Sequence, residues 1–343
     1  MPRTLCFPPP VPARNRRYIQ PVFLPFSGCP YRCAFCSQEL QSGTKASPIP
    51  GMLETLEAEL QKASNAGEEK REIAFYGGTF TALPLDAQLS CLEIAARYRK
   101  KGLVTRVRAS TRPDCITHEG LAALFRHGLD MLELGVQSFD DAVLAASRPG
   151  YTGEEAEKAC SLVRESGLAL GVQLMPGLPG MNAEIFRKDI LRMLSVQPET
   201  LRLYPCQVIR GTRLATMWQE GRYTPWQLDD TILLLAEALL LAETAGVAVI
   251  RIGLAPEPGF PEHILAGPSH PALGARVRGR ALLERIRSHC AELEAPPSLL
   301  TLPRRLRGEV GGHRKELLPL YAELGLTRKN ICWHDHEHCE LTD

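Results

Sequence analysis

GCPYRCAFC, residues 28–36, sets three cysteines at C-x3-C-x2-C spacing directly after an apolar run at residues 21–26. The run predicts a short buried strand, so Cys29, Cys33 and Cys36 should lie together on the loop that follows it. Three thiolates on one loop can hold three irons of a [4Fe–4S] cube, whereas an ordinary cluster of this kind has four cysteine ligands. The missing ligand would leave one iron open to bind another molecule.

Two other interpretations of the three cysteines remain open at this point. The thiolates could bind zinc together with a distant fourth ligand, or they could be buried structural thiols. The neighbouring side chains Tyr31 and Phe35 would shield a cluster from water, which helps to set its potential.

The spacing of the cysteines, on a loop after the first strand, resembles the signature of the radical S-adenosylmethionine (SAM) superfamily. The resemblance implies that the open iron binds the amino and carboxylate groups of SAM. One electron, supplied by a reductant such as ferredoxin or flavodoxin, would then cleave SAM to a 5′-deoxyadenosyl radical that abstracts hydrogen from a substrate. The cofactor carries such chemistry, and the protein orients and shields it.

The totals of the chain describe a globular protein without a strong charge bias. Its 343 residues allow one large domain or one domain with a small appendage. Its net charge of +1 does not by itself indicate a nucleic-acid partner. No apolar stretch is long enough to span a membrane, and the nearest, residues 232–241, is expected to form a buried helix. Eleven cysteines and an N-terminus without a secretory pattern favour a reducing cytoplasm and metal ligation over disulfides.

Strand and helix patterns alternate through the middle of the chain. After residues 21–26, strands are expected at residues 72–76, 104–110, 130–136, 168–174 and 200–204, with a further strand at 247–254. Helices separate the first six strands, so the sheet should be parallel. We predict an α/β fold, a partial (β/α)6 barrel of the radical SAM type, with its active site at the carboxyl ends of the strands. Its predicted bounds are residues 18–275, between an N-terminal arm at 1–17 and a small helical C-terminal extension with a Cys/His tail at 276–343.

The first candidate SAM-binding residues follow the second and third strands. Gly77 and Gly78 let the backbone approach a ligand without a Cβ in the way, although a plain tight turn would have the same composition. The resemblance implies that Gly77, Gly78 and Thr79 bind the amino group of SAM. Arg112 and Asp114 could bind or orient the carboxylate and ribose of SAM, or form an ordinary ion pair.

Two later strand ends complete the predicted SAM site. Gln137 and Ser138 stand where polar side chains would meet the ribose hydroxyls, and the segment GVQSFDD that contains them resembles that of the family. Met175 and Pro176 begin the stiff turn MPGLPG, which the family uses near the adenine. Tyr151 matches the family only loosely and could equally be a structural cap.

The segments after the sixth strand narrow the resemblance. LYPCQVIRGTRL at residues 203–214 looks like a segment of the elongator-complex catalytic subunit, and GPSHPALG at 267–274 resembles its shorter bacterial homologues. The resemblance implies tRNA as a partner and a tRNA base as the substrate. That subunit spaces its first two cysteines more widely and carries an acetyltransferase domain, for which this chain has no room. We therefore expect the radical half only, without the acetyl-CoA step.

The leading hypothesis is a radical SAM enzyme of this elongator-like branch. One alternative is radical SAM chemistry on a small molecule or a tetrapyrrole. Another is an Fe–S or zinc binding module that does not cleave SAM. No acid/base pair in the sequence identifies the hydrogen that would be abstracted.

The C-terminal extension holds two further candidates. Residues 304–315 form a basic segment with glycines that could contact RNA, as the glycine loop of KH domains does, or could be a solvated loop. The tail offers a set of thiols and imidazoles that suits zinc: Cys332, His334, His336, His338 and Cys339. On an extended strand Cys339 would face away from the others, so one ion would require the chain to curl around it. A disordered polar tail is the alternative.

Overall fold

The computed structural model describes residues 3–10, 18–43, 48–254 and 258–343. The described residues form two compact units, and each unit is discontinuous in sequence. The larger unit is drawn from Arg16–Trp226 and Val247–Pro268. The smaller unit is drawn from Met1–Asn15, Gln227–Gly246 and Ser269–Asp343.

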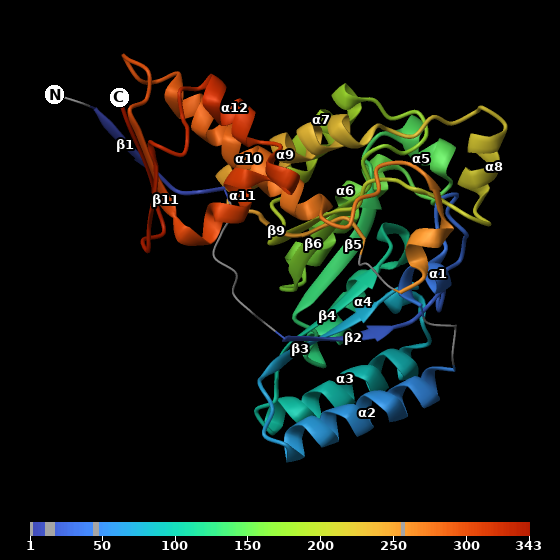
Figure 1. Ribbon diagram of the computed structural model, residues 1–343. Coiled ribbons are helices and arrows are strands. Elements are labelled where there is room, and N and C mark those ends of the chain that lie inside the picture. The colour runs from blue at the N-terminus through green and yellow to red at the C-terminus, as the bar shows by residue number, and fades with distance from the viewer. Residues whose placement is uncertain (1–2, 11–17, 44–47, 255–257) are drawn as a thin grey trace. The chain divides into compact units, whose positions relative to one another are not determined.

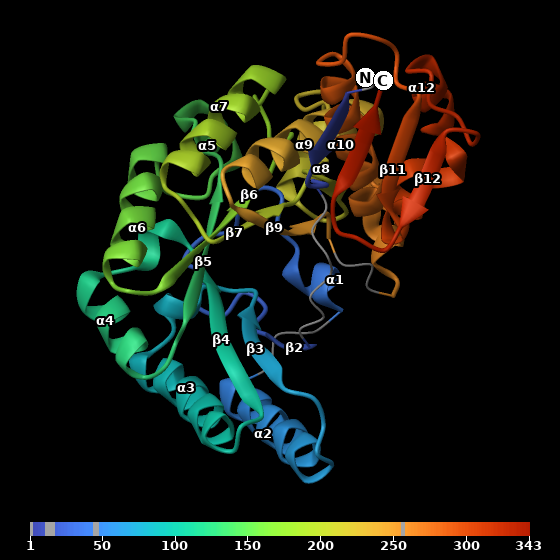
Figure 2. The same cartoon turned by 90° about the vertical axis from the view of Figure 1, so that its left-hand side faces the viewer.

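A parallel sheet of seven strands organises the larger unit. Its strands, in spatial order, are β2 (Tyr18–Phe23), β3 (Arg71–Tyr76), β4 (Val104–Thr111), β5 (Met131–Gln137), β6 (Ala169–Leu174), β7 (Thr200–Leu203) and β9 (Ala248–Ile252). Every neighbouring pair is parallel, and the sheet curves (Figure 2). This confirms the predicted α/β partial barrel, to which the further strand expected near residues 247–254 adds a seventh strand.

Helices connect successive strands of this sheet. They are α1 (Gln38–Ser42), α2 (Ile49–Asn65), α3 (Leu85–Lys100), α4 (His118–Arg126), α5 (Asp141–Ser147), α6 (Gly153–Glu165), α7 (Ala183–Ser195) and α8 (Arg213–Gln219). Single 3₁₀ turns lie at η1 (Phe80–Ala82), η2 (Pro113–Cys115) and η3 (Phe260–His263), and a two-stranded antiparallel ribbon joins β8 (Val208–Ile209) to β10 (Ile264–Ala266). The local sequence explains several helix starts. Thr152 and Glu155, for example, form a capping box at the start of α6.

The inner strands β3 to β7 are largely buried on both faces, which explains why the sequence showed apolar runs there in place of strict alternation. Ile73, Ala74 and Phe75 are consecutive on β3, and all three side chains are fully buried. A parallel sheet reaches this state when helices cover one face and the barrel interior closes the other. The carboxyl ends of the strands then meet at one edge, where the loops form a common surface.

The smaller unit is a four-stranded sheet with helices packed on one face. It contains α9 (Leu228–Thr244), α10 (Leu273–Cys290), α11 (Arg307–Gly311) and α12 (Leu318–Glu323), with 3₁₀ turns η4 (Arg304–Leu306) and η5 (His313–Lys315). The strands are ordered β1 (Thr4–Phe7), β13 (Cys339–Thr342), β11 (Leu299–Pro303) and β12 (Ile331–His334). Figure 1 shows β1 and β11 in this sheet, in which β13 lies between them. Leu282, Leu300 and Tyr321 are fully buried in its core.

The division of the chain differs from the predicted bounds in two respects. Residues 4–7 of the expected arm form an outer strand of the small sheet, because β1 pairs with β13; residues 1–2 and 11–17 of that arm lie outside the described residues. The expected helical extension is a mixed sheet-and-helix unit that also takes in α9, which packs on α10. Within the described ranges, α9 and the other helices all fall short of the length and apolarity that membrane spanning requires.

Candidate active site

The three cysteines lie on the loop between β2 and α1, at the carboxyl edge of the parallel sheet. Cys29, Cys33 and Cys36 are each partly buried. Burial raises the pKa of Cys36 to about 12, and the neighbouring thiols Cys33 and Cys29 add to the rise. The three thiols are thus close enough to influence one another. Thiolates in such a site repel one another, and a metal cation between them would offset this repulsion.

The turn after β3, residues 77–79, packs closely against the cysteine loop because it contains glycines. The backbone N–H of Thr79 donates to the carbonyl of Ser27 at 2.7 Å. Gly78 has φ +60°, and a Cβ there would lie 2.3 Å from the same Ser27 oxygen. Gly28, on the cysteine loop, likewise has no room for a Cβ, which would meet the Thr79 carbonyl oxygen at 2.5 Å. Glycine is therefore required on both sides of this contact.

Two side chains reinforce the contact between the turn and the loop. The Thr79 side chain is fully buried, and its hydroxyl lies 3.3 Å from the sulfur of Cys29. The Gln38 amide oxygen accepts hydrogen bonds from the backbone N–H groups of Phe26 and Gly78. The predicted residues Gly77, Gly78 and Thr79 thus lie beside the cysteines, and Thr79 contacts one of them directly.

Arg112 and Asp114 form the ion pair that was one of the two predicted alternatives. The guanidinium donates two hydrogen bonds to the carboxylate, at 3.0 and 2.8 Å. The same guanidinium donates to the carbonyl of Pro149, and its Nη1 lies 3.9 Å from the sulfur of Cys33. It also lies over the ring of Tyr31. Arg112 therefore connects the strand end to the cysteine loop and places positive charge beside a thiol.

Ser138 makes a different contact from the one expected of a ribose-binding side chain. Its side chain is fully buried, and its hydroxyl donates to Asp189 on α7 at 2.6 Å. The backbone N–H of Phe139 donates to the other oxygen of this carboxylate at 2.8 Å. Gln137 remains partly exposed with φ +64°, and its amide oxygen accepts a hydrogen bond from Gln173. Asp189 thus holds the segment after β5, which leaves Gln137 at the strand end.

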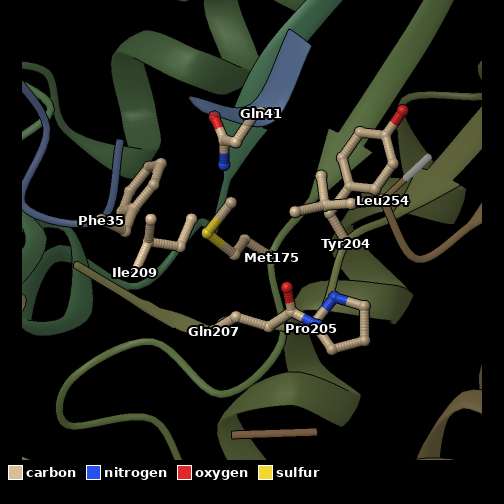
Figure 3. Close-up of a pocket in the computed structure, with 8 residues that line it drawn as sticks. All are labelled: Phe35, Gln41, Met175, Tyr204, Pro205, Gln207, Ile209 and Leu254. Carbon is tan, nitrogen blue, oxygen red and sulfur yellow. The ribbon is translucent and has the colours of Figure 1, made fainter. Parts of the chain in front are cut away.

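Met175 and Pro176 are both buried in the turn after β6. Met175 lines a small cavity at the carboxyl ends of the last strands, next to the cysteine loop (Figure 3). The cavity is lined by Phe35, Gln41, Met175, Tyr204, Pro205, Gln207, Ile209 and Leu254. Pro176 contributes its carbonyl, which accepts from the N–H of Cys206 at 2.8 Å. Tyr151, the possible cap, hydrogen bonds with its hydroxyl to the Gly135 carbonyl at 2.6 Å.

Sequence reasoning missed a network of charged side chains inside the curved sheet. Arg202 on β7 donates to Glu133 on β5 at 2.5 Å, to the Tyr76 hydroxyl at 2.7 Å and to the Tyr204 hydroxyl at 3.0 Å. Arg108 on β4 forms a longer ion pair with Glu133, at 3.4 Å. The available signal was single charged residues within otherwise apolar strands, which on a sheet buried on both faces must be paired. Tyr204 links this network to the cavity.

The donor set fits an iron–sulfur cluster and SAM. Three cysteine thiols share one loop, which also carries Tyr31 and Phe35. The turn Gly77–Thr79 packs directly against this loop. The site therefore offers soft ligands for iron, with the backbone of two glycines close to them.

Comparisons with known proteins identify the family to which the chain is related. Residues 23–193 match the radical SAM superfamily, and residues 198–282 match the radical SAM C-terminal domain. The tRNA uridine(34) acetyltransferase of Methanocaldococcus infernus is 27% identical over 249 residues, which cover 61% of this chain and 47% of that protein. Elongator complex protein 3 of Mus musculus is 31% identical over 196 residues, covering 50% of this chain and 35% of that protein. The chain thus spans about half or less of the length of these curated relatives.

Solved structures show the same fold at lower identity. Elp3 from the archaeon M. infernus, with its N-terminus deleted, has a TM-score of 0.61 at 22% identity and covers 91% of this chain and 68% of its own. Coproporphyrinogen III oxidase from Escherichia coli, a radical SAM enzyme, has a TM-score of 0.51 at 19% identity and covers 67% of this chain and 53% of its own. The radical SAM superfamily, which the two family matches identify, implies a [4Fe–4S] cluster and SAM as cofactors. From its sequence matches and its cysteine loop, the chain belongs to the radical SAM superfamily.

Proposed function

We propose that this protein holds a [4Fe–4S] cluster through Cys29, Cys33 and Cys36, cleaves SAM there and modifies a base of tRNA. One observation carries the proposal: the cysteine loop interlocks with the Gly77–Thr79 turn, so that the thiols and the glycine backbone lie together. When bound, the cluster would supply one electron for reductive cleavage of SAM to a 5′-deoxyadenosyl radical. A protein reductant such as ferredoxin or flavodoxin would deliver that electron.

The residues around the cysteines divide into binding and positioning roles. The backbone at Gly77 and Gly78, which packs closely against the cysteine loop, would receive the amino group of SAM. Arg112 is held by Asp114, and its positive charge beside Cys33 would compensate the negative charge of a thiolate-ligated cluster. Thr79 would act as a positioning residue through its contact with Cys29.

The remaining predicted residues surround the place that the rest of SAM would take. Gln137, partly exposed at the end of β5, is the better candidate for the ribose hydroxyls, because the hydroxyl of Ser138 is already bonded to Asp189. Met175, which lines the cavity, and the neighbouring buried Pro176 would provide apolar surroundings that suit the adenine ring. Ser138 would then serve the site indirectly, by holding the segment that carries Gln137.

The substrate base would enter on the side of the cavity in Figure 3. Phe35 and Met175 give this cavity apolar walls close to the cysteine loop, and Gln41 and Gln207 add polar side chains to its lining. Apolar walls and polar side chains are what recognition of an unstacked base requires. The elongator-type relatives support tRNA as the source of that base.

We propose that the protein works in the reducing cytoplasm. Its eleven cysteines all lie within the described ranges and are free, which is compatible with a reducing compartment. tRNA and the reductant would be available there.

The test is anaerobic turnover with and without tRNA. The protein is reconstituted with iron and sulfide, reduced with dithionite, and supplied with SAM and bulk tRNA; 5′-deoxyadenosine and digested tRNA nucleosides are then measured by mass spectrometry. We expect tRNA to increase 5′-deoxyadenosine and one nucleoside to change mass, with neither effect in Cys36→Ala. If tRNA did not change the formation of 5′-deoxyadenosine, the substrate would instead be a small molecule or a tetrapyrrole. A fully loaded cluster without SAM cleavage would favour a binding module.

A further inference from the structure

Among the described residues, the helices of the smaller unit pack on one face of its four-stranded sheet and leave the other face open within that unit. The face that the helices cover is buried: Leu300 on β11 and Leu341 on β13 pair directly and are fully buried in the core. Side chains one position along each strand point the opposite way. Thr301, between Cys332 on β12 and Glu340 on β13, therefore marks a polar row on the open face.

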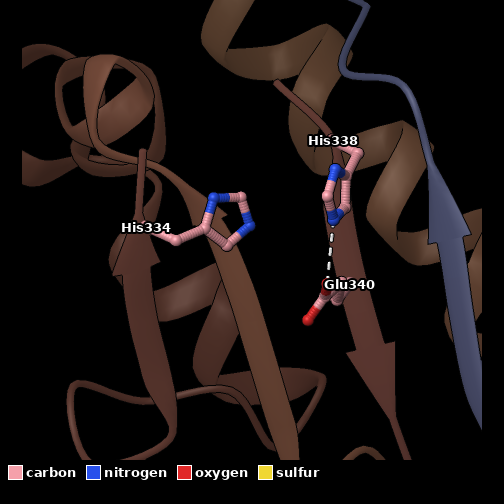
Figure 4. Close-up of side chains that lie close together, drawn as sticks. All are labelled: His334, His338 and Glu340. Carbon is pink, nitrogen blue, oxygen red and sulfur yellow. Dashed lines mark hydrogen bonds and ion pairs between the residues drawn. The ribbon is translucent and has the colours of Figure 1, made fainter. Parts of the chain in front are cut away.

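Three potential metal ligands meet on this open face. His334 ends β12, His338 precedes β13, and Glu340 lies within β13; one ligand atom from each lies within 4.8 Å of the other two. Figure 4 shows the ring of His334 pointing toward His338, whose Nε2 lies 2.8 Å from the carboxylate of Glu340. A third ring, His336, lies 5.2 Å from His334 and 5.5 Å from His338 between ring centroids.

His334 supplies a second, independent observation. Its Nε2 atom is buried and has no hydrogen-bond partner among the described residues. A buried polar nitrogen without a partner costs free energy unless a ligand satisfies it. Its Nδ1 accepts the backbone N–H of His336 at 3.1 Å, so the neutral ring carries its proton on Nε2. Metal binding at Nε2 would move that proton to Nδ1 and release the exposed N–H of His336 to water.

The buried face explains why the ligand set differs from the one expected from the sequence. Cys339 is fully buried in the hydrophobic core beside Leu302 and Leu341, so its thiol cannot reach the open face. Cys332 is exposed and shares the open face, but it does not belong to the group of ligand atoms within 4.8 Å. The turn at residues 335–338 curls the chain, and this brings the histidines together without Cys339.

We propose that His334, His338 and Glu340 bind a divalent transition-metal ion of the Zn²⁺ class. Two imidazoles and one carboxylate form a donor set that zinc accepts, with His336 or water in the fourth position. The ion would join the ends of β12 and β13, which are separated in the sheet by β11. Its role would be to fasten the C-terminal strands, independently of the chemistry proposed for the cysteine loop.

The test uses the full chain with its iron–sulfur cluster loaded, so that the cluster thiols are already occupied. One equivalent of Zn²⁺ is added without oxygen, unbound metal is removed, and bound zinc is measured by elemental analysis and zinc-edge X-ray absorption. We expect one zinc per chain with ligands at about 2.0–2.1 Å and no sulfur shell at about 2.3 Å. Zinc should also raise the urea midpoint for unfolding of the smaller unit.

Four variants decide the assignment. His334→Gln, His338→Gln and Glu340→Gln should each weaken zinc binding by about tenfold or more, since even residues that only support a ligand cost that much. His127→Gln is the matched control, an exposed histidine of the larger unit with its own backbone contact. Full zinc retention in the three site variants, a sulfur shell, or no bound zinc in the wild type would each overturn the proposal.

Discussion

Replacing Gly78 by alanine should displace the cysteine loop. The residue has φ +60°, and its new Cβ would lie 2.3 Å from the carbonyl oxygen of Ser27 and 2.5 Å from that of Leu24. The left-handed backbone costs a residue with a Cβ about 1–2 kcal/mol, and forced overpacking costs about 1–3 kcal/mol more. Both atoms that would have to give way are backbone atoms of the cysteine loop itself. Their movement should therefore impair cluster binding as well as reduce the free energy of unfolding.

Gly67→Ala is the matched control for this substitution. Gly67 has φ +63°, but a Cβ there would have no heavy atom within 4 Å, so only the backbone cost applies. The assay compares urea unfolding of both metal-free variants, and iron and sulfide content after anaerobic reconstitution. We expect Gly78→Ala to lose the greater part of its bound iron and Gly67→Ala to retain it. Equal stability and equal iron content in the two variants would refute the interlocking of the turn and the loop.

Three further substitutions test other parts of the site. Burial raises the pKa of Asp189 from 3.8 to about 6, so the folded state holds this proton more tightly. Relative to Asp189→Asn, the free energy of unfolding of the wild type should fall by about 2 kcal/mol as the pH rises from 4 to 7. Arg202→Met leaves Glu133 buried with one long ion pair and should cost about 3 kcal/mol in the same assay. Arg112→Lys loses the two-point hydrogen bond to its carboxylate, so chelators should remove iron faster from the reconstituted variant.

Each of these predictions has a result that would contradict it. A pH profile of Asp189→Asn parallel to that of the wild type would mean that the carboxyl group titrates normally. Adding Glu133→Gln to Arg202→Met should recover part of the lost stability, because it removes the buried charge; a further loss would show that the arginine matters for another reason. For Arg112→Lys, chelation at the wild-type rate would separate this side chain from the cluster.

The fold was predictable because its pattern is repeated. Alternating strand and helix signals predicted a parallel sheet, and the carboxyl ends of its strands were the places where glycine, charge and cysteine clustered in the sequence. Gly77 and Arg112 could therefore be placed near the cysteines before any coordinates were known. Long-range pairing set the contacts that the sequence did not reveal, such as the hydrogen bond from Ser138 to Asp189, 51 positions later.

The C-terminal part of the chain was harder to predict for a physical reason. Its sheet combines Thr4–Phe7 with three strands from the last 45 residues, and no local pattern specifies pairing between chain ends. The sequence suggested the imidazoles of the tail as one possible ligand set, but alternation alone could not show the turn that brings His334 and His338 together. Charged residues within strands, such as Arg202 and Glu133, gave a signal only once both faces of the sheet were known to be buried.

The most direct test of the central claim is 5′-deoxyadenosine formation by the reduced, anaerobically reconstituted protein in the presence of SAM. The account predicts formation by the wild type and by Cys91→Ala, whose thiol is buried in α3, and none by Cys29→Ala, Cys33→Ala or Cys36→Ala. Formation that persists without any one of the three loop cysteines, or that is absent from a wild type with a full complement of iron and sulfide, would contradict it.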